Sequence, residues 1–75
     1  MVGSDVLKKF VELTGTKEHD IWEWFPNGKD SVRLRMHRRF GRKHIDLIFT
    51  YRSDREWTIE TVDAYLRRVG EVKNE

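Results

Sequence analysis

The strict alternation of apolar and charged residues between positions 32 and 37 constrains the fold of this chain more than any other feature. Val32, Leu34 and Met36 occupy the even positions, and arginine or histidine occupies each odd position. A period of two residues places the two sets on opposite faces of a β-strand. The pattern therefore predicts a strand with one dry face and one solvated face, as in an antiparallel sheet covered on one side.

Residues 44–52 show the same alternation and predict a second strand. Their apolar set continues the dry face, and their other set is mostly charged or polar. Two such runs joined by a short link are typical of a β-hairpin. The dry set is Ile45, Leu47, Phe49 and Tyr51, and the opposite set is His44, Asp46, Ile48, Thr50 and Arg52.

Two hairpin registers are compatible with the residues that join these strands. Gly41 suits the first position of a two-residue type II′ turn, which pairs His37 with Asp46. A four-residue loop over 39–42 instead pairs Arg35 with Asp46. Both registers keep the same dry face, so the sequence leaves this choice open.

An earlier strand is predicted in "HDIWEWF", which is rich in aromatic and β-branched residues and is followed by the turn signal "PNG". A three-residue loop over 26–28 places Trp22 opposite Val32, whereas a two-residue Asn-Gly loop would bury Glu23. A one-residue slip inverts a whole strand, so the longer loop is favoured. We therefore expect Trp22 and Trp24 to face the core, and Ile21 and Glu23 to face solvent.

A helix is predicted over residues 5–14, where apolar residues recur at spacings of three and four. Ser4 suits the N-cap, and Gly15 suits the left-handed position that ends a helix. The apolar stripe consists of Val6, Leu7, Phe10 and Val11, with Leu13 and Thr14 at its end.

A second helix is predicted in "WTIETVDAYLRRVG". Thr58 suits its N-cap, which places Trp57 and Val62 at the two positions of a hydrophobic staple. Gly70 follows the last apolar position and suits the helix end. The apolar stripe is Ile59, Val62, Tyr65, Leu66 and Val69.

These elements predict a single small α+β domain over residues 1–75. The order is α-β-β-β-α, with a three-stranded antiparallel meander and both helices packed on one face of the sheet. Residues 70–75 are expected to form a frayed tail. A chain of 75 residues must spend most of its apolar positions on packing, which leaves little room for an enclosed site.

The sequence favours a binding protein over an enzyme. It contains no cysteine, no P-loop and no nucleophile elbow, and we expect no catalytic residues and no cofactor. His37, His44 and Asp46 have the chemistry of zinc ligands, but a fourth ligand is missing and neighbouring arginines repel a cation, so no metal site is expected. The absence of cysteine and of a signal sequence predicts a cytoplasmic location.

Residues 33–44 form the strongest functional signal. This window holds six of the fifteen Lys and Arg residues and none of the thirteen Asp and Glu residues, so it carries +6 and the other 63 residues carry −4. Such a concentration predicts a basic β-hairpin that contacts nucleic acid or another polyanion through its phosphates. The expected contact residues are Arg33, Arg35, His37, Arg38, Arg39, Arg42 and Lys43.

An alternative function is that of a protein-interaction or regulatory module. In this hypothesis the exposed sheet face, with Ile21, Ile48 and Phe25 among its charges, docks on an acidic protein. The expected partners are therefore nucleic acid, either DNA or RNA, or an acidic protein. No membrane contact is expected, and the chain is expected to be a monomer or a weak homodimer.

Overall fold

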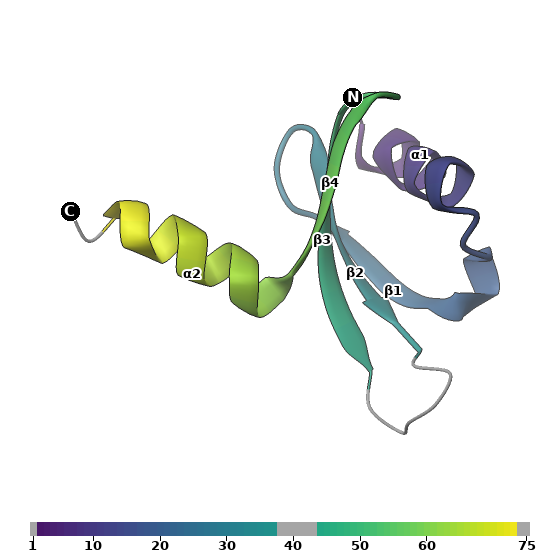
Figure 1. Cartoon of the computed structure of the whole chain (residues 1–75). Helices are drawn as coiled ribbons and strands as arrows, with labels where there is room; N and C mark the ends of the chain where they lie inside the picture. Colours follow the sequence, from purple (N-terminus) through teal and green to yellow (C-terminus); the bar gives the residue numbers. More distant parts are fainter. Residues whose placement is uncertain (1, 38–43, 74–75) are drawn as a thin grey trace.

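A four-stranded antiparallel sheet, ordered β1-β2-β3-β4, lies at the centre of this computed structural model, which describes residues 2–37 and 44–73 (Figure 1). The chain forms one small α+β domain in the order α-β-β-β-β-α. In chain order, the elements are α1 (Gly3–Thr14), a short 3-10 turn (Glu18–Asp20), β1 (Ile21–Pro26), β2 (Ser31–Met36), β3 (Ile45–Ser53), β4 (Glu56–Thr61) and α2 (Val62–Lys73).

The predicted dry face of the sheet is the face that α1 covers. Val6 and Phe10 of α1 are buried against residues of β2 and β3, and the rings of Phe10 and Phe49 meet edge to face at 5.2 Å. Alternate residues of β2 and β3 therefore supply the sheet side of the core, as the period of two predicts. The fully buried sheet residues of this core are Val32, Leu34 and Phe49.

The first helix lies close to its predicted position. It begins at Gly3, so Val2 rather than Ser4 occupies the N-cap position. It ends as predicted, because Gly15 has a φ of 70° and its N–H donates to the carbonyl oxygen of Val11. The start of α1 lies against β1, since a Cβ added at Gly3 would meet the Pro26 side chain at 3.2 Å.

The predicted orientation of β1 is correct in its second half and wrong in its first half. Trp24 pairs with Leu34 and faces the core, but a register shift, or β-bulge, separates Ile21 from Glu23. Ile21 pairs with Met36 and packs against the core, and Trp22 becomes the extra residue of the bulge, 52% exposed. A bulge adds one residue to one strand, so alternation alone cannot follow the chain through it.

The first hairpin loop differs from the expectation, and the second hairpin takes one of the two registers that the sequence left open. Pro26 pairs with Val32, so residues 27–30 link β1 to β2 in place of the three-residue loop. The observed pairing of β1 with β2 is shifted from the predicted register by an even number of residues, so Trp24 still faces the core as predicted. Arg35 pairs with Asp46, which is the four-residue-loop register, and the type II′ register is wrong. The loop residues themselves, 38–43, lie outside the described residues.

The largest correction concerns residues 56–61, which form β4 rather than the start of the second helix. Trp57, Ile59 and Thr61 pair with alternate residues of β3, so the sheet has four strands instead of three. The turn before β4 is held by Ser53, whose Oγ accepts hydrogen bonds from the backbone N–H groups of residues 55 and 56. Aromatic and β-branched residues favour a strand here, and pairing with β3 outweighs the helical pattern.

The second helix starts later and packs differently from the prediction. Thr61, rather than Thr58, caps it, because its Oγ1 accepts a hydrogen bond from the Ala64 N–H. The helix continues through Gly70 to Lys73. Figure 1 shows α1 and α2 on opposite sides of the sheet, so the two helices do not share one face.

A bidentate ion pair joins α2 to β4. Arg68 donates from Nη2 to Glu60 Oε1 at 2.8 Å and from Nε to Glu60 Oε2 at 3.2 Å. These bonds lower the pKa of the Glu60 carboxyl below its ordinary value. Neither α1 nor α2 has the length and apolar character that a membrane-spanning helix needs within the described part of the chain.

Candidate nucleic-acid interface

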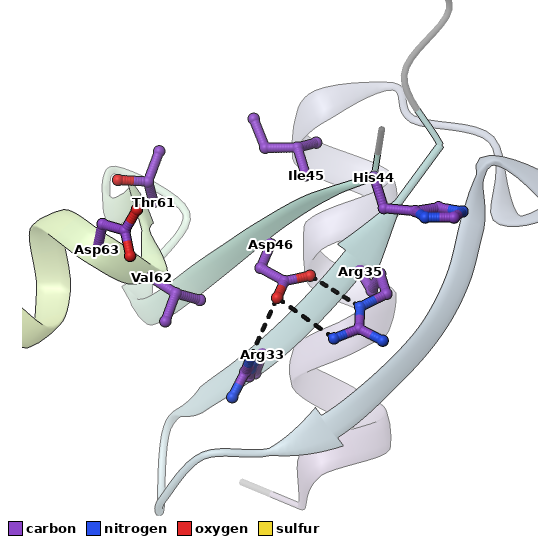
Figure 2. A pocket seen from close by; sticks show the side chains of 8 residues that line it. All are labelled: Arg33, Arg35, His44, Ile45, Asp46, Thr61, Val62 and Asp63. Atoms are coloured by element: carbon purple, nitrogen blue, oxygen red, sulfur yellow. Dashed lines mark hydrogen bonds and ion pairs between the residues drawn. The ribbon is translucent and has the colours of Figure 1, made fainter. Parts of the chain in front are cut away.

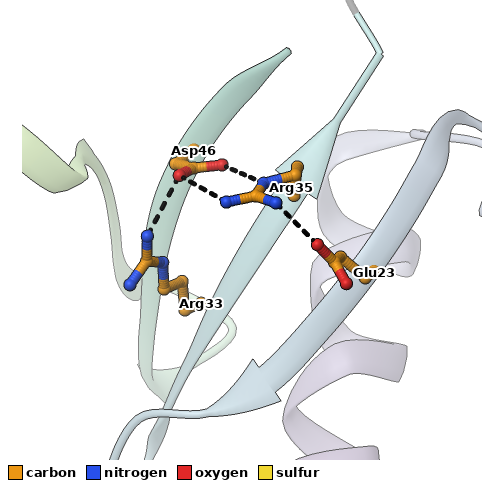
Figure 3. A network of polar contacts seen from close by, with 4 residues as sticks. All are labelled: Glu23, Arg33, Arg35 and Asp46. Atoms are coloured by element: carbon orange, nitrogen blue, oxygen red, sulfur yellow. Dashed lines mark hydrogen bonds and ion pairs between the residues drawn. The ribbon is translucent and has the colours of Figure 1, made fainter.

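The sheet face opposite α1, here called the outer face, carries a network of two arginines and two carboxylates (Figure 3). Arg35 of β2 donates from Nε to Asp46 Oδ1 at 3.0 Å and from Nη1 to Glu23 Oε1 at 2.8 Å. Arg33 donates from Nη2 to Asp46 Oδ2 at 3.0 Å. Because Glu23 belongs to β1 and Asp46 to β3, the network connects three strands.

This network neutralises its own charge. The hydrogen bond from Arg35, followed by that from Arg33, lowers the pKa of Asp46, so the carboxylate stays ionised at neutral pH. Asp46 in turn raises the pKa of the Arg35 guanidinium, with a smaller contribution from Glu23. Two cations and two anions thus balance, and this part of the outer face presents little net field to an approaching polyanion.

The bulge in β1 places Trp22 beside two histidines on the outer face. The indole ring lies 3.8 Å from the His44 ring and 5.8 Å from the His37 ring, measured between centroids, and the two imidazoles are 5.2 Å apart. The Arg35 guanidinium lies 5.9 Å from the indole centroid. We call Trp22, His37 and His44 the ring cluster. His37 and His44 are the described residues that border segment 38–43 on either side.

A second exposed aromatic residue lies further along β1. Phe25 pairs with Arg33 and is 50% exposed. The isoleucines that the protein-docking hypothesis placed on this surface are not available there, because Ile21 packs against the core and Ile48 is 2% exposed. The apolar surface available on β1 is therefore aromatic rather than aliphatic.

A hollow lies between the outer face and the start of α2 (Figure 2). Figure 2 shows Arg33 and Arg35 both directed toward Asp46, with Asp63 on the other side of the hollow. The arginines of the hollow are matched by carboxylates, so it lacks the excess of one charge that would select a charged ligand. Its lining residues are Arg33, Arg35, His44, Ile45, Asp46, Thr61, Val62 and Asp63.

The structure brings some of the predicted contact residues together and does not describe the others. Arg33, Arg35 and His37 lie on the outer face, and both arginines already bind carboxylates of the same chain. The remaining predicted contacts lie outside the described residues. These are Arg38, Arg39, Arg42 and Lys43.

The charge balance of the whole chain nevertheless points to residues 38–43. Residues 38–43 contain four of the fifteen cationic residues and no acid, so they carry +4. The other 69 residues hold eleven cations and thirteen acids, and together they carry −2. The excess positive charge of the chain therefore belongs to residues 38–43 of the sequence.

His37, His44 and Asp46 do not assemble into a metal site. The Asp46 oxygens accept hydrogen bonds from Arg33 and Arg35, which occupy the positions that a cation would need. Within residues 2–37 and 44–73, no group of three His, Asp or Glu side chains is placed to hold a metal ion.

Comparison of the chain with protein-family models, with curated protein sequences and with solved structures finds no match.

Sequence reasoning missed Trp22 as a surface residue. The signal that could have found it is the run "IWEWF", which has more bulky residues than one alternating face can bury. If Ile21 and Trp24 both face the core, an extra residue must lie between them, and that residue bulges toward the other face. Ile21 and Trp24 are three positions apart, and regular alternation places residues an odd number of positions apart on opposite faces.

Proposed function

We propose that this protein binds nucleic acid by electrostatic contact at the end of the hairpin formed by β2 and β3. The observation that carries the proposal is the charge of residues 38–43, which hold four cations and no acid. The ion pairs of Arg33 and Arg35 with Asp46 and Glu23 count against these two arginines as phosphate contacts. With these charges balanced, the excess of positive charge belongs to residues 38–43. A polyanion is attracted to the place where positive charge is not compensated.

The proposed contacts have unequal roles. The three arginines and one lysine of residues 38–43 supply most of the phosphate contacts, and the guanidinium fork suits a phosphate through two parallel hydrogen bonds. His37 and His44 border this segment and are exposed, so they extend the contact surface onto the sheet. Arg33 and Arg35 contribute less, because a phosphate must compete there with Asp46 oxygens 3.0 Å away.

The proposal predicts a strong dependence of affinity on salt. If about four phosphates are neutralised, the affinity for duplex DNA falls about a hundredfold between about 50 and 200 mM salt. Replacing Arg38, Arg39 and Arg42 together with alanine leaves about one such contact, so the slope of log affinity against log salt falls from about −3.6 to about −0.9. Fluorescence anisotropy with a labelled DNA measures both values.

A matched control removes three arginines that lie outside the proposed contact residues. Arg52, Arg55 and Arg67 are exposed, and their joint replacement with alanine changes the net charge by the same amount. The control variant should keep the wild-type slope. A flat salt response of the wild-type protein, or an equal loss in both triple variants, would contradict the proposed site.

The proposal favours nucleic acid over an acidic protein as the partner, because the aliphatic residues expected at a protein-docking face are turned inward or buried. The proposed location is the cytoplasm, which a chain without cysteine favours.

A further inference from the structure

Two large aromatic side chains of β1 are displayed on the outer face although the sheet has a core on its other side. Trp22 is 52% exposed and Phe25 is 50% exposed. The neighbouring residues Ile21 and Trp24 of the same strand pack against the core. The bulge is what turns Trp22 outward, and bulges commonly re-aim a side chain in this way.

The indole of Trp22 is held in place before any ligand arrives. His44 lies 3.8 Å from it, and the Arg35 guanidinium lies 5.9 Å from its centroid. Arg35 is itself fixed by hydrogen bonds to Asp46 and Glu23. An aromatic ring whose orientation is already fixed loses little side-chain freedom on binding, so more of the contact energy appears as affinity.

The ion network lies alongside both rings. Phe25 pairs with Arg33, and Glu23 between the two aromatic residues pairs with Arg35. The residues across from both rings on this face are therefore polar and charged. The arginines of the network also provide flat guanidinium groups, which stack on bases as well as on indole rings.

The spacing of the two rings decides what kind of nucleic acid suits them. Along β1 their backbone positions are three residue steps apart, which corresponds to at most about 10 Å. Adjacent stacked nucleotides of a duplex rise by about 3.4 Å, and their faces are covered by their neighbours. Bases that reach both rings must therefore be unstacked from one another, and an unpaired strand supplies such bases.

We infer that the ligand is single-stranded nucleic acid, with one base stacked on Trp22 and a second base stacked on Phe25. This inference rests on the proposed function, because the positive charge near the ring cluster brings the phosphate backbone to this face. Stacking on a base requires only its π-face, so the preference is for unpaired strands and not for a particular sequence.

The experiment compares a twelve-nucleotide oligo(dT) with a duplex of the same length and label at one fixed salt concentration. Trp22→Ala should weaken oligo(dT) binding at least about tenfold, and Phe25→Ala should weaken it about fivefold, since a base stacked on an aromatic ring contributes measurably to affinity. Duplex binding should change less than twofold in both variants. Trp22→Phe should restore most of the oligo(dT) affinity.

The matched control is Leu66→Ala, which removes an exposed apolar side chain of α2 that is 59% exposed. It should bind oligo(dT) as the wild-type protein does. In the wild-type protein, the indole N–H resonance of Trp22, assigned with Trp22→Phe, should shift much further on addition of oligo(dT) than on addition of duplex, because the duplex reaches the indole only through His44. This measurement does not depend on how well any alanine variant folds.

The outcomes separate the inference from the proposed function. Salt-dependent binding that is equal for oligo(dT) and duplex and is unchanged in Trp22→Ala and Phe25→Ala overturns the inference and leaves the proposed function standing. No salt-dependent binding to either nucleic acid overturns both. Preferential binding of oligo(dT) that is lost in Trp22→Ala and kept in Trp22→Phe supports both.

Discussion

The two faces of this sheet are built from alternate residues of the same strands, yet they differ in almost every physical property. The face under α1 buries Val32, Leu34 and Phe49 completely. The outer face carries an ion network and two exposed aromatic side chains. The difference teaches that the core and the proposed binding surface use different sets of residues, so the exposed residues of the outer face can change with little effect on the fold.

The contrast also separates two kinds of interaction. Apolar burial under α1 removes side chains from water and contributes about 1.5–3 kcal/mol for each fully buried large residue. Partly exposed ion pairs such as those of Arg33 and Arg35 contribute less, because water and salt screen them. The outer network therefore serves mainly to orient side chains and to balance charge.

The largest expected effect comes from comparing two phenylalanines on opposite faces. Phe49→Ala removes a fully buried ring that contacts Phe10, Tyr51 and Trp57, and we expect a loss of about 4 kcal/mol in the free energy of unfolding. Phe25→Ala removes a half-exposed ring and should cost less than about 0.5 kcal/mol. Urea denaturation measures both, and equal losses would show that the faces do not differ as described.

An intermediate effect tests the bulge that divides Ile21 from Trp22. Ile21→Lys places a charge against the core and should cost about 2 kcal/mol, whereas Trp22→Lys keeps the charge in water and should cost less than about 0.5 kcal/mol. A strand without a bulge would reverse this order. Thermal denaturation of the two variants decides between the arrangements, and the reversed order would rule out the bulge.

The smallest expected effect concerns the outer network and its dependence on pH. Asp46→Asn should cost about 1 kcal/mol at pH 7, because partly exposed charged hydrogen bonds from two arginines are lost. The folded state lowers the pKa of Asp46, so this stabilisation is present above the ordinary value of 3.8 and is lost as the pH falls through the lower folded value.

The difference in unfolding free energy between wild type and Asp46→Asn should therefore be constant from pH 7 to about pH 5 and should shrink in stronger acid. Glu12→Gln is a suitable control because Glu12 is an exposed carboxylate on α1, away from the network. It should show no such convergence. A wild-type advantage over Asp46→Asn that persists unchanged to about pH 2 would contradict the described network.

Sequence periodicity correctly predicted the elements whose apolar residues face the core in the folded protein. The alternation in β2 and β3 and the stripe of α1 are local, and each matches the face that tertiary packing buries. The Gly15 helix end was also predictable, because its left-handed conformation has a residue-specific cause. Two helices and an antiparallel sheet follow from these signals.

The remaining features depend on contacts that no local pattern records. Residues 56–61 fit a helix start and a strand equally well, and hydrogen bonding to β3 selects the strand. The later start of α2 follows from this change, because the helix begins only after β4 has ended. The sequence between β2 and β3 was compatible with a two-residue and a four-residue loop. Only the four-residue loop pairs Arg35 with Asp46.

The candidate interface was predictable as a concentration of charge but not as a surface. Counting residues located the basic segment, whereas the neutralisation of Arg33 and Arg35 appears only once Glu23 and Asp46 are placed on neighbouring strands. The role of Trp22 depended on the bulge, which is an interruption of the very periodicity used to predict the strand.

The bulge has an evolutionary consequence. Removing the single codon for Trp22 would join Ile21 directly to Glu23, whose partners Met36 and Arg35 are already adjacent, and so restore an unbroken ladder. The core beneath would keep every one of its side chains. During evolution, the insertion or deletion of one codon could therefore add or remove the exposed indole of Trp22 without any change in the core residues.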